Sequence, residues 1–562
     1  MRKVLLVTAA VAVAVIFFGW TTLPPRPVSV ATTVDPDLQR RTIAGAYHVH
    51  SSRSDGGGDK NAIAAAASRA GLAFVILTDH GDGTRQPDPA EFLHGVLCID
   101  AVEISTTGGH YVALDMKPSP YPLGGEPSAV VEDVHRLGGF GIAAHPESPR
   151  AELAWSDWSA PIDGIEWLSA DTEWRNESRA TLARALVGYL VRPAPALASM
   201  LDRPTATLQR WDALAATRPI VGLAAHDAHG GIGRGVEEGG ARRAALGGIP
   251  SYEASFRTFS NRVILDAPLS GDAAAAARQV LDAIEHGRVF AVIDALASPG
   301  FVEFRDADTN RVHQIGSVQS GVFSGSLNVS MPAGAWVFDT NSDQDVDIPV
   351  NLTPGRTNPV PLFQLKRGAT RFEVRLPDAP GTPPVPWLVT NPVYVLPAPA
   401  PSVTRPADTE VRPLAPDAAW HVEKDPGSNA AITTTGGEVT FTYTLRPGDR
   451  ASQFAAVVTD LASGSEPFER IRLSASAARP GRLSIQLRYP QKGGIRWGTS
   501  AYVDSTPRDL LVAVDRMPPL DRQAGPAPDP SSAVALLIVV DLTNARPGDS
   551  NTIHLGSVRF AR

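Results

Sequence analysis

Cysteine is the residue that this 562-residue chain has least of. Its single cysteine, Cys98, excludes an intramolecular disulfide framework, and its place in the apolar run Val96–Ile99 predicts a buried strand residue. An excess of positive charge is also missing, since the formal net charge is −8 at pH 7. Nucleic acid is therefore not expected as a partner. A convincing Ser-His-Asp signature is absent as well, which disfavours a protein nucleophile.

The N-terminal residues have the pattern of a targeting segment. Arg2 and Lys3 precede an apolar stretch, residues 4–20, at the short end of the roughly 17–25 residues that span a bilayer. The small residues at 29–31 offer a cleavage site. We expect residues 1–31 to be either a cleaved signal peptide or an anchor in the inner membrane, which would then give the protein its membrane contact. Either way the rest is exported to the periplasm or another extracytoplasmic space.

Between about residues 42 and 300, apolar strand-like runs alternate with Ala-rich or amphipathic helical stretches. That alternation predicts a parallel βα architecture in the form of a barrel. The strand candidates are Gly45–His50, Ala73–His80, Val96–Ser105, His110–Asp115, Phe140–His145, Ile162–Trp167 and Ile220–His226.

Beyond residue 300 the pattern changes to short strands and turns. Residues 301–396 are expected to be immunoglobulin-like, residues 397–417 a Pro-rich linker, and residues 418–562 a jelly-roll-like β-sandwich. Aromatic residues of the last domain have two interpretations, a carbohydrate groove or ordinary core packing, and aromatics in a sandwich are more often core. They are Trp420, Tyr489, Trp497 and Tyr502.

Nine histidines and carboxylates stand at or beside the ends of the strand-like runs of residues 42–300. Because side chains at the C-terminal ends of barrel strands converge on one face, these residues are expected to form one polynuclear metal site. Imidazole and carboxylate ligands together suit zinc, manganese or iron. The nine are His48, His50, Asp55, His80, Glu103, His110, His145, Asp227 and His229.

The order of these motifs resembles the PHP (polymerase and histidinol phosphatase) domain family over about residues 42–300. That family has an HxH with a downstream SDG, then a TDH, a Glu, a His opening the next strand, an AHP and a final DxH. In this chain the motifs stand as His48-Val49-His50, Ser54-Asp55-Gly56, Thr78-Asp79-His80, Glu103, His110, Ala144-His145-Pro146 and Asp227-Ala228-His229. The segments Gly164–Leu168, Trp174-Arg175 and Tyr252–Phe259 further resemble the exported carbaryl-hydrolase (CehA/McbA-like) group.

The resemblance implies a distorted (β/α)7 barrel that holds two or three divalent ions. It also implies how the ligands are shared. The first ion would take His48, His50, Glu103 and Asp227; the second would share Glu103 and add His110 and His145; the third would take Asp55, His80 and His229. Asp79 is expected to orient a ligand from outside the coordination sphere, and His226 either contacts substrate or packs structurally.

The predicted function is an exported hydrolase in which metal-bound hydroxide cleaves a small-molecule phosphoester or a carboxylic or carbamic ester. Candidates for assisting the leaving group are His229, Arg53 and Arg175, and the two arginines could also clamp an anionic substrate or be ordinary surface residues. The alternative is a cell-envelope binding protein whose sandwich binds a glycan or a surface, with a non-catalytic barrel.

Overall fold

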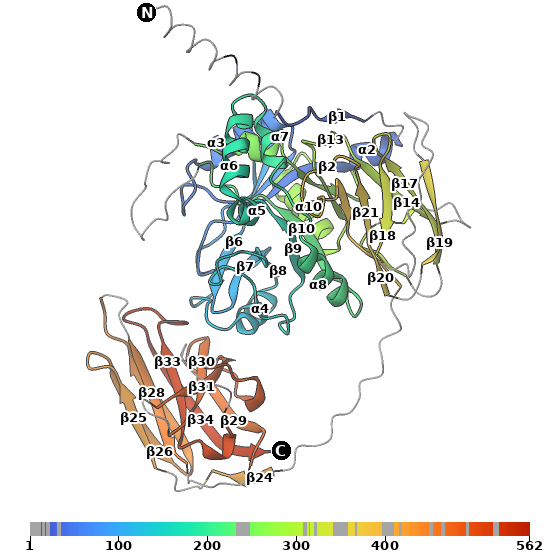
Figure 1. Ribbon diagram of the computed structural model, residues 1–562. Helices are drawn as coiled ribbons and strands as arrows, with labels where there is room; N and C mark the ends of the chain where they lie inside the picture. The colour runs from blue at the N-terminus through green and yellow to red at the C-terminus, as the bar shows by residue number, and fades with distance from the viewer. Residues whose placement is uncertain are drawn as a thin grey trace, which may run out of the picture. The chain divides into compact units, whose positions relative to one another are not determined.

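The computed structural model forms two compact units (Figure 1). The first comprises Met1–Gly81, Pro87–Lys117 and Val134–Ala400, and the second comprises Asp82–Gln86, Pro118–Asp133 and Pro401–Arg562. The structure describes residues 13, 17, 23–30, 35–231, 248–306, 312–313, 315–319, 323–340, 358–365, 368–395, 410–414, 419–448, 453–461, 467–490, 494–520 and 528–562. Most of the predicted leader and of the predicted linker lies outside these residues. Within them, no helix is both long and apolar enough to cross a membrane.

Two mixed sheets form the centre of the first unit. The larger has nine strands in the order β18 (Trp336–Asp339), β21 (Phe372–Arg375), β22 (Leu388–Thr390), β12 (Val289–Val292), β11 (Ser260–Ile264), β2 (Thr42–Val49), β3 (Phe74–Leu77), β5 (Val96–Asp100) and β4 (Glu91–Leu93). The smaller has five, in the order β10 (Val221–Ala225), β9 (Gly164–Ser169), β8 (Phe140–Ala143), β7 (Gly109–Leu114) and β6 (Val102–Thr106).

The expected (β/α)7 barrel was wrong. The pairs β2–β3, β3–β5, β8–β9 and β9–β10 are parallel, but β6–β7, β7–β8, β2–β11 and β11–β12 are antiparallel. The strands belong to two separate sheets, which approach each other at single bridges, Val49 to Ala228 and His80 to Glu103. Alternating apolar runs predict strands but not their direction. The turn between Thr106 and Gly109 is too short for the crossover that a parallel pair requires.

Residues 301–396, expected as a separate immunoglobulin-like domain, belong to the same compact unit as residues 42–81, 87–117 and 134–300. Their strands β21 and β22 extend the nine-stranded sheet, where β22 pairs with β12. Other short strands of this unit form small sheets. One sheet pairs β1 (Val28–Ser29) with β13 (Ala297–Ser298). A second has the strand order β15 (Val312–His313), β14 (Phe301–Asp306), β17 (Phe323–Ser330) and β19 (Asn358–Leu365). A third has the order β16 (Val318–Gln319), β23 (Val393–Val395) and β20 (Gly368–Thr370).

Capping residues set the bounds of the main helices. Asp59 accepts a hydrogen bond from Ala62 N at the start of α3, which ends at Gly71 in the left-handed conformation. Asp272 caps α10 in the same way. The helices are α2 (Pro36–Arg41), α3 (Lys60–Ala70), α4 (Pro127–Arg136), α5 (Ala170–Asn176), α6 (Arg179–Tyr189), α7 (Pro193–Ala198), α8 (Thr205–Ala215), α9 (Tyr252–Phe256) and α10 (Ala273–Glu285).

The second unit contains an antiparallel two-sheet sandwich. Burial alternates along β29 (Arg470–Ala477), which is the pattern of a strand with one face on a core. One sheet contains β26 (Asn429–Thr435), β27 (Glu438–Thr444), β34 (Ser550–Ala561), β29 and β32 (Arg508–Ala513), with β24 (Glu410–Pro413) beside β34. The other contains β25 (Trp420–Lys424), β28 (Phe454–Asp460), β33 (Ala535–Asp541), β30 (Gly481–Arg488) and β31 (Arg496–Val503).

A buried ion-pair network joins β21 to helix α8 in the first unit. The Arg371 side chain is fully buried and donates to Asp212 Oδ1 and Oδ2 at 3.1 and 2.9 Å. It also donates to Glu373 Oε1 at 2.8 Å and lies over the Trp211 ring. Arg203 binds the same Glu373 carboxylate. Since each charge is paired, the removal of Arg371 would leave the buried Glu373 with less compensation.

Replacement of Arg371 by methionine is expected to lower the free energy of unfolding of the first unit by about 3–5 kcal/mol. The exposed pair Arg40–Asp37 provides the control, because Arg40→Ala should cost less than about 1 kcal/mol. Urea titration read by pulse proteolysis measures both. Equal costs for the two variants would contradict the role given to the network.

Candidate functional site

All nine predicted ligand residues lie together where the two sheets of the first unit approach each other. His48 is in β2, Glu103 in β6 and His110 in β7. The others follow strands directly or lie in the loop after β2. Each of these side chains has a nitrogen or oxygen within about 4 Å of one from at least one other member of the nine. The convergence expected for a barrel is therefore achieved by two open sheets.

The first group of donor atoms surrounds a small space between His48, His50, Glu103 and Asp227. His48 Nε2 lies 3.1 Å from His50 Nε2, 3.3 Å from Glu103 Oε2 and 3.5 Å from Asp227 Oδ1. His50 Nε2 lies 3.3 Å from Glu103 Oε2 and 3.2 Å from Asp227 Oδ1. Four ligands at about 2.0–2.1 Å from a tetrahedral ion would lie about 3.3 Å apart. This group therefore has the spacing that a single divalent ion requires.

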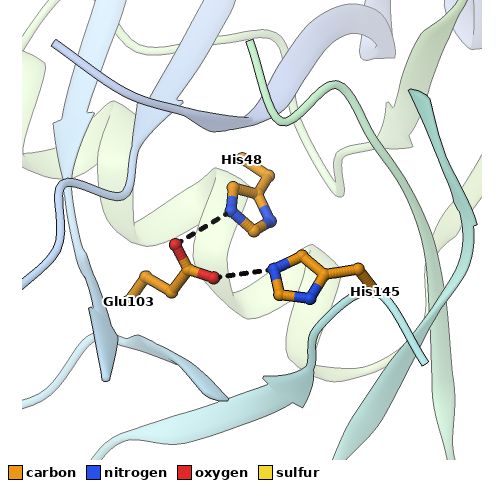
Figure 2. A group of neighbouring side chains, drawn as sticks. All are labelled: His48, Glu103 and His145. Atoms are coloured by element: carbon orange, nitrogen blue, oxygen red, sulfur yellow. Dashed lines mark hydrogen bonds and ion pairs between the residues drawn. The ribbon is translucent and has the colours of Figure 1, made fainter. Parts of the chain in front are cut away.

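The other oxygen of Glu103 faces a second pair of histidines. Glu103 Oε1 lies 2.8 Å from His110 Nδ1 and 2.9 Å from His145 Nε2. Figure 2 shows the carboxylate between the rings of His48 and His145, with one oxygen directed at each. A carboxylate in this position can bridge two ions.

The third group lies on the more open side of the site. Asp55 Oδ2 is 3.2 Å from His229 Nε2 and 3.7 Å from His80 Nε2. The other nitrogen of His80 is 3.2 Å from Glu103 Oε2. The side chains of His80, Asp55 and His229 are 36%, 33% and 24% exposed, whereas His48 and Glu103 are buried. The site is therefore accessible to solvent from this side.

Glu103 Oε2 shows that the donor set suits a cation. This oxygen is buried and has no hydrogen-bond partner, although His48, His50 and His80 each place a ring nitrogen 3.2–3.3 Å away. A buried carboxylate oxygen without a partner is costly. A divalent ion in the first group would satisfy it. The residues present therefore fit a metal cluster of the predicted kind.

The charges of the groups are strongly coupled. Burial alone would lower the pKa of His50, but its close contacts with the Asp227 and Glu103 carboxylates outweigh burial and raise this pKa to about 10. Burial would raise the pKa of Glu103, yet the neighbouring His48 and His80 hold it well below its ordinary value. His50 and the Glu103 carboxylate therefore compensate each other's charge. A bound cation would displace protons from the rings.

Three of the nine residues have a strained backbone. The φ angles of His48, His145 and Asp227 are +62°, +29° and +43°, a region that side chains other than glycine rarely adopt. At His48 the register between β2 and β3 also shifts, between Ala46 and Val49. The irregular backbone aims these side chains into the site rather than across the sheet.

Glu166 and Asp79 position the ligand residues. Glu166 Oε1 lies 2.5 Å from His48 Nδ1, and Oε2 accepts from the His145 backbone N–H at 2.7 Å. Glu166 thereby leaves His48 Nε2 free to face the site. Asp79 accepts 2.7 Å hydrogen bonds from Ser51 and Ser54, and so holds the loop that carries Asp55. The segment Gly164–Leu168, which contains Glu166, was recognised in the sequence as a subgroup motif, but no role was assigned to Glu166 there.

The predicted substrate residues have other partners. Arg53 Nη1 donates to Asp100 at 3.0 Å and its Nη2 to Asp88 at 2.5 Å. Arg175 binds Asp171, and its guanidinium lies over the Trp174 ring. An anion clamp would have to compete with these carboxylates.

His229 and His226 differ sharply in their surroundings. His229 Nδ1 donates to the Asp227 carbonyl, so its Nε2 is available to the site. His226 is buried, stacks on Phe259 and has both ring nitrogens near backbone carbonyls. Its position matches structural packing.

Trp420 lies apart from Trp497 and Tyr502, the other partly buried aromatic residues that were predicted for a carbohydrate groove. Tyr489 is buried in the sandwich core, and Trp420 and Trp497 pack against that core partly buried. Their strands β25 and β31 are the two edges of one sheet. Tyr502 stacks on Tyr121, with ring centroids 6.3 Å apart.

Glu173 in α5 is a buried acid that the sequence analysis did not identify. It is 4% exposed, and its Oε2 accepts from the Asp202 backbone N–H. Burial raises the pKa of Glu173 to about 8, and the nearby Asp202 and Glu147 act in the same direction. The side chain is therefore protonated in the folded protein near neutral pH.

Comparison with known proteins adds little to this geometry. No protein-family model matches the chain. "Uncharacterized protein MJ1587" of Methanocaldococcus jannaschii is 31% identical over 107 residues, which are 18% of this chain and 62% of that protein. The chain thus spans less than two thirds of this relative.

Solved structures similar to part of the chain include carbohydrate-binding modules. A family 11 module from Clostridium thermocellum, in complex with a β-1,3-1,4-mixed-linked tetrasaccharide, is 13% identical and covers 25% of this chain and 87% of its own, with a TM-score of 0.21. A family 4 module is 15% identical, covers 25% of this chain and 94% of its own, and has a TM-score of 0.18. At TM-scores this low, the likeness supports no conclusion about the function of this chain.

Replacement of Glu173 by glutamine is expected to remove a pH-dependent loss of stability. In the wild type, the unfolded chain releases this proton above about pH 4.5, whereas the folded protein keeps it to about pH 8. Stability from this group is therefore complete below pH 4.5 and is lost as pH rises to 8. At pH 9 the variant should be more stable by about 3–5 kcal/mol, as measured by pulse proteolysis in urea. Glu152→Gln, at an exposed site, is the control. A difference that does not grow with pH would contradict the account.

Proposed function

We propose that the chain is a metal-dependent hydrolase with the ligand chemistry of the PHP family, acting on a phosphoester or on a carboxylic or carbamic ester. The observation that carries the proposal is the Glu103 carboxylate, which has one buried oxygen facing each of two histidine groups. Export of the protein, suggested by residues 1–31, is part of the same proposal. The architecture is the pair of open sheets described above.

Two or three zinc, manganese or iron ions held by the nine residues would activate water and polarise the phosphoryl or carbonyl oxygen of a substrate. The chain itself supplies the positioning. Glu166 orients His48, and Asp79 holds the loop of Asp55. The exposed side, at His80 and His229, admits the substrate. His229 lies on that open side and has its Nε2 near Asp55, which supports a role either as ligand or as proton donor to the leaving group.

A second candidate function is glycan binding by the sandwich, with the first unit as a non-catalytic scaffold. It is favoured by the two-sheet architecture of the second unit and by the partly exposed Trp420 and Trp497. Carbohydrate-binding modules among the similar structures suggest the ligand to test, a mixed-linked β-1,3-1,4 tetrasaccharide. The two functions can also coexist in one chain.

Replacement of His48 or Asp227 by alanine is expected to abolish hydrolysis, because each removes a ligand from the group that shares Glu103. The zinc- or manganese-loaded full chain would be assayed with chromogenic phosphomonoester, phosphodiester, carboxylic ester and aryl carbamate substrates. Turnover of one class should fall at least about 100-fold in both variants, and bound metal per chain should fall with it. His286→Ala, at an exposed helix end, should retain both.

The outcomes separate the two candidates. Metal bound by the wild type but not by the variants, with turnover of one substrate class, supports the hydrolase. Equal turnover in wild type and both variants contradicts it. Bound metal without turnover, together with saturable binding of the tetrasaccharide that Trp420→Ala weakens, favours the glycan-binding candidate.

A further inference from the structure

Exposed aliphatic side chains are concentrated at the C-terminal end of α6. Leu186, Val187, Leu190 and Val191 are 50%, 45%, 76% and 62% exposed. Elsewhere in the part of the first unit that the structure describes, large aliphatic residues of this exposure are isolated, such as Val28 and Val318. Single exposed apolar residues need no explanation, but a group of four usually marks an interaction surface.

Leu186 and Val187 lie in the last turn of α6, and Leu190 and Val191 follow directly after its last residue, Tyr189. The turn continues there, with Val191 N donating to the Gly188 carbonyl, so the four exposed side chains are neighbours in one patch. The other side of the helix, at Ala185 and Gly188, is buried. A Cβ at Gly188 would lie 3.3 Å from Ala196 of α7. Small residues therefore pack inward while the larger aliphatic ones face outward, the reverse of an ordinary surface helix.

The charges around this patch are positive. Helix α6 carries Arg179 and Arg184 and no acidic residue. Arg26 and Arg192 lie beside it, where they line a pocket of about 860 Å³ together with Arg257 and Arg262. The two acidic residues of this pocket form ion pairs, Glu253 with Arg257 and Asp294 with Arg262. An apolar patch flanked by arginines suits the headgroup and acyl boundary of an anionic bilayer.

The chain that follows the apolar N-terminal stretch is attached beside α6. Arg192 Nη1 donates to the Pro24 carbonyl oxygen at 2.5 Å. A Cβ added at Gly188 would lie 3.3 Å from Cδ of the Pro24 ring. The apolar stretch ends at Trp20, four residues earlier, which is at most about 14 Å of extended chain. A bilayer that holds the apolar stretch ending at Trp20 would therefore lie close to α6.

We propose that the outward face of α6, formed by Leu186, Val187, Leu190 and Val191 with Arg26, Arg184 and Arg192, rests in the interface of a membrane that contains anionic phospholipid. A second copy of the chain suits the face less well. In a two-fold dimer the same arginines would face one another without acidic partners on the helix. The proposal is independent of the hydrolase function.

A fluorescent probe at position 190 tests the proposal in the full chain. Leu190→Cys would be labelled with nitrobenzoxadiazole and reconstituted into vesicles of phosphatidylcholine with about 30% phosphatidylglycerol. The native Cys98 is buried, and burial raises its pKa to about 11, so it reacts slowly. The matched control is Leu511→Cys, an exposed position in β32 of the second unit.

Nitroxide-labelled lipid should quench the probe at 190 at least about twofold more than the probe at 511. This difference should shrink when phosphatidylglycerol is omitted, and also in an Arg26→Glu, Arg184→Glu background. Equal quenching at the two positions, or a 190 probe quenched only by aqueous iodide, would overturn the proposal. A blue shift at 190 that depends on protein concentration without lipid would instead identify a second copy as the occupant.

Discussion

The buried carboxylate of Glu103 is the constraint around which the first unit is arranged. With 1% of the residue exposed, an ionised carboxylate is stable only if positive charge surrounds it on both oxygens. His48, His50 and His80 approach one oxygen, while His110 and His145 approach the other. These histidines come from strands of two different sheets. The arrangement of those sheets is thus coupled to one side chain.

The backbone shows the cost of this convergence. His48, His145 and Asp227 all have positive φ, which is strained for residues with a Cβ. The rest of the unit must stabilise them. Glu166 does so for two of them, since it contacts the His48 ring and the His145 backbone N–H together. The Arg371 network stabilises the unit at a different place, between β21 and α8.

The sequence predicted the convergence of these nine side chains better than it predicted the fold. A polar side chain at the end of a buried apolar run needs a partner, and such a pattern can be recognised in the sequence alone. This pattern identified His48, His80, His145 and Asp227. The same pattern does not indicate whether neighbouring strands run parallel or antiparallel. For this reason the antiparallel β6, β7 and β8 were assigned to a parallel barrel. The role of Glu166 depends on a contact across 118 residues.

The surface of α6 shows a second limit of sequence reasoning. Helical stretches were expected between the strands of residues 42–300, but in such a stretch Leu186 and Leu190 would normally indicate a buried face. Only the packing of Ala185 and Gly188 shows that the smaller residues are the buried ones. Which side of an amphipathic helix faces inward is decided by its neighbours, here α7, rather than by the size of its apolar residues.

The most direct test of the metal site is anomalous X-ray diffraction at the zinc edge from crystals of the zinc-loaded full chain. The account predicts at least two anomalous peaks close to Glu103, one beside His48, His50 and Asp227 and one beside His110 and His145. Crystals of Glu103→Gln should lose occupancy at both. A zinc-loaded crystal with no peak near Glu103, or with peaks only at surface residues, would contradict the account.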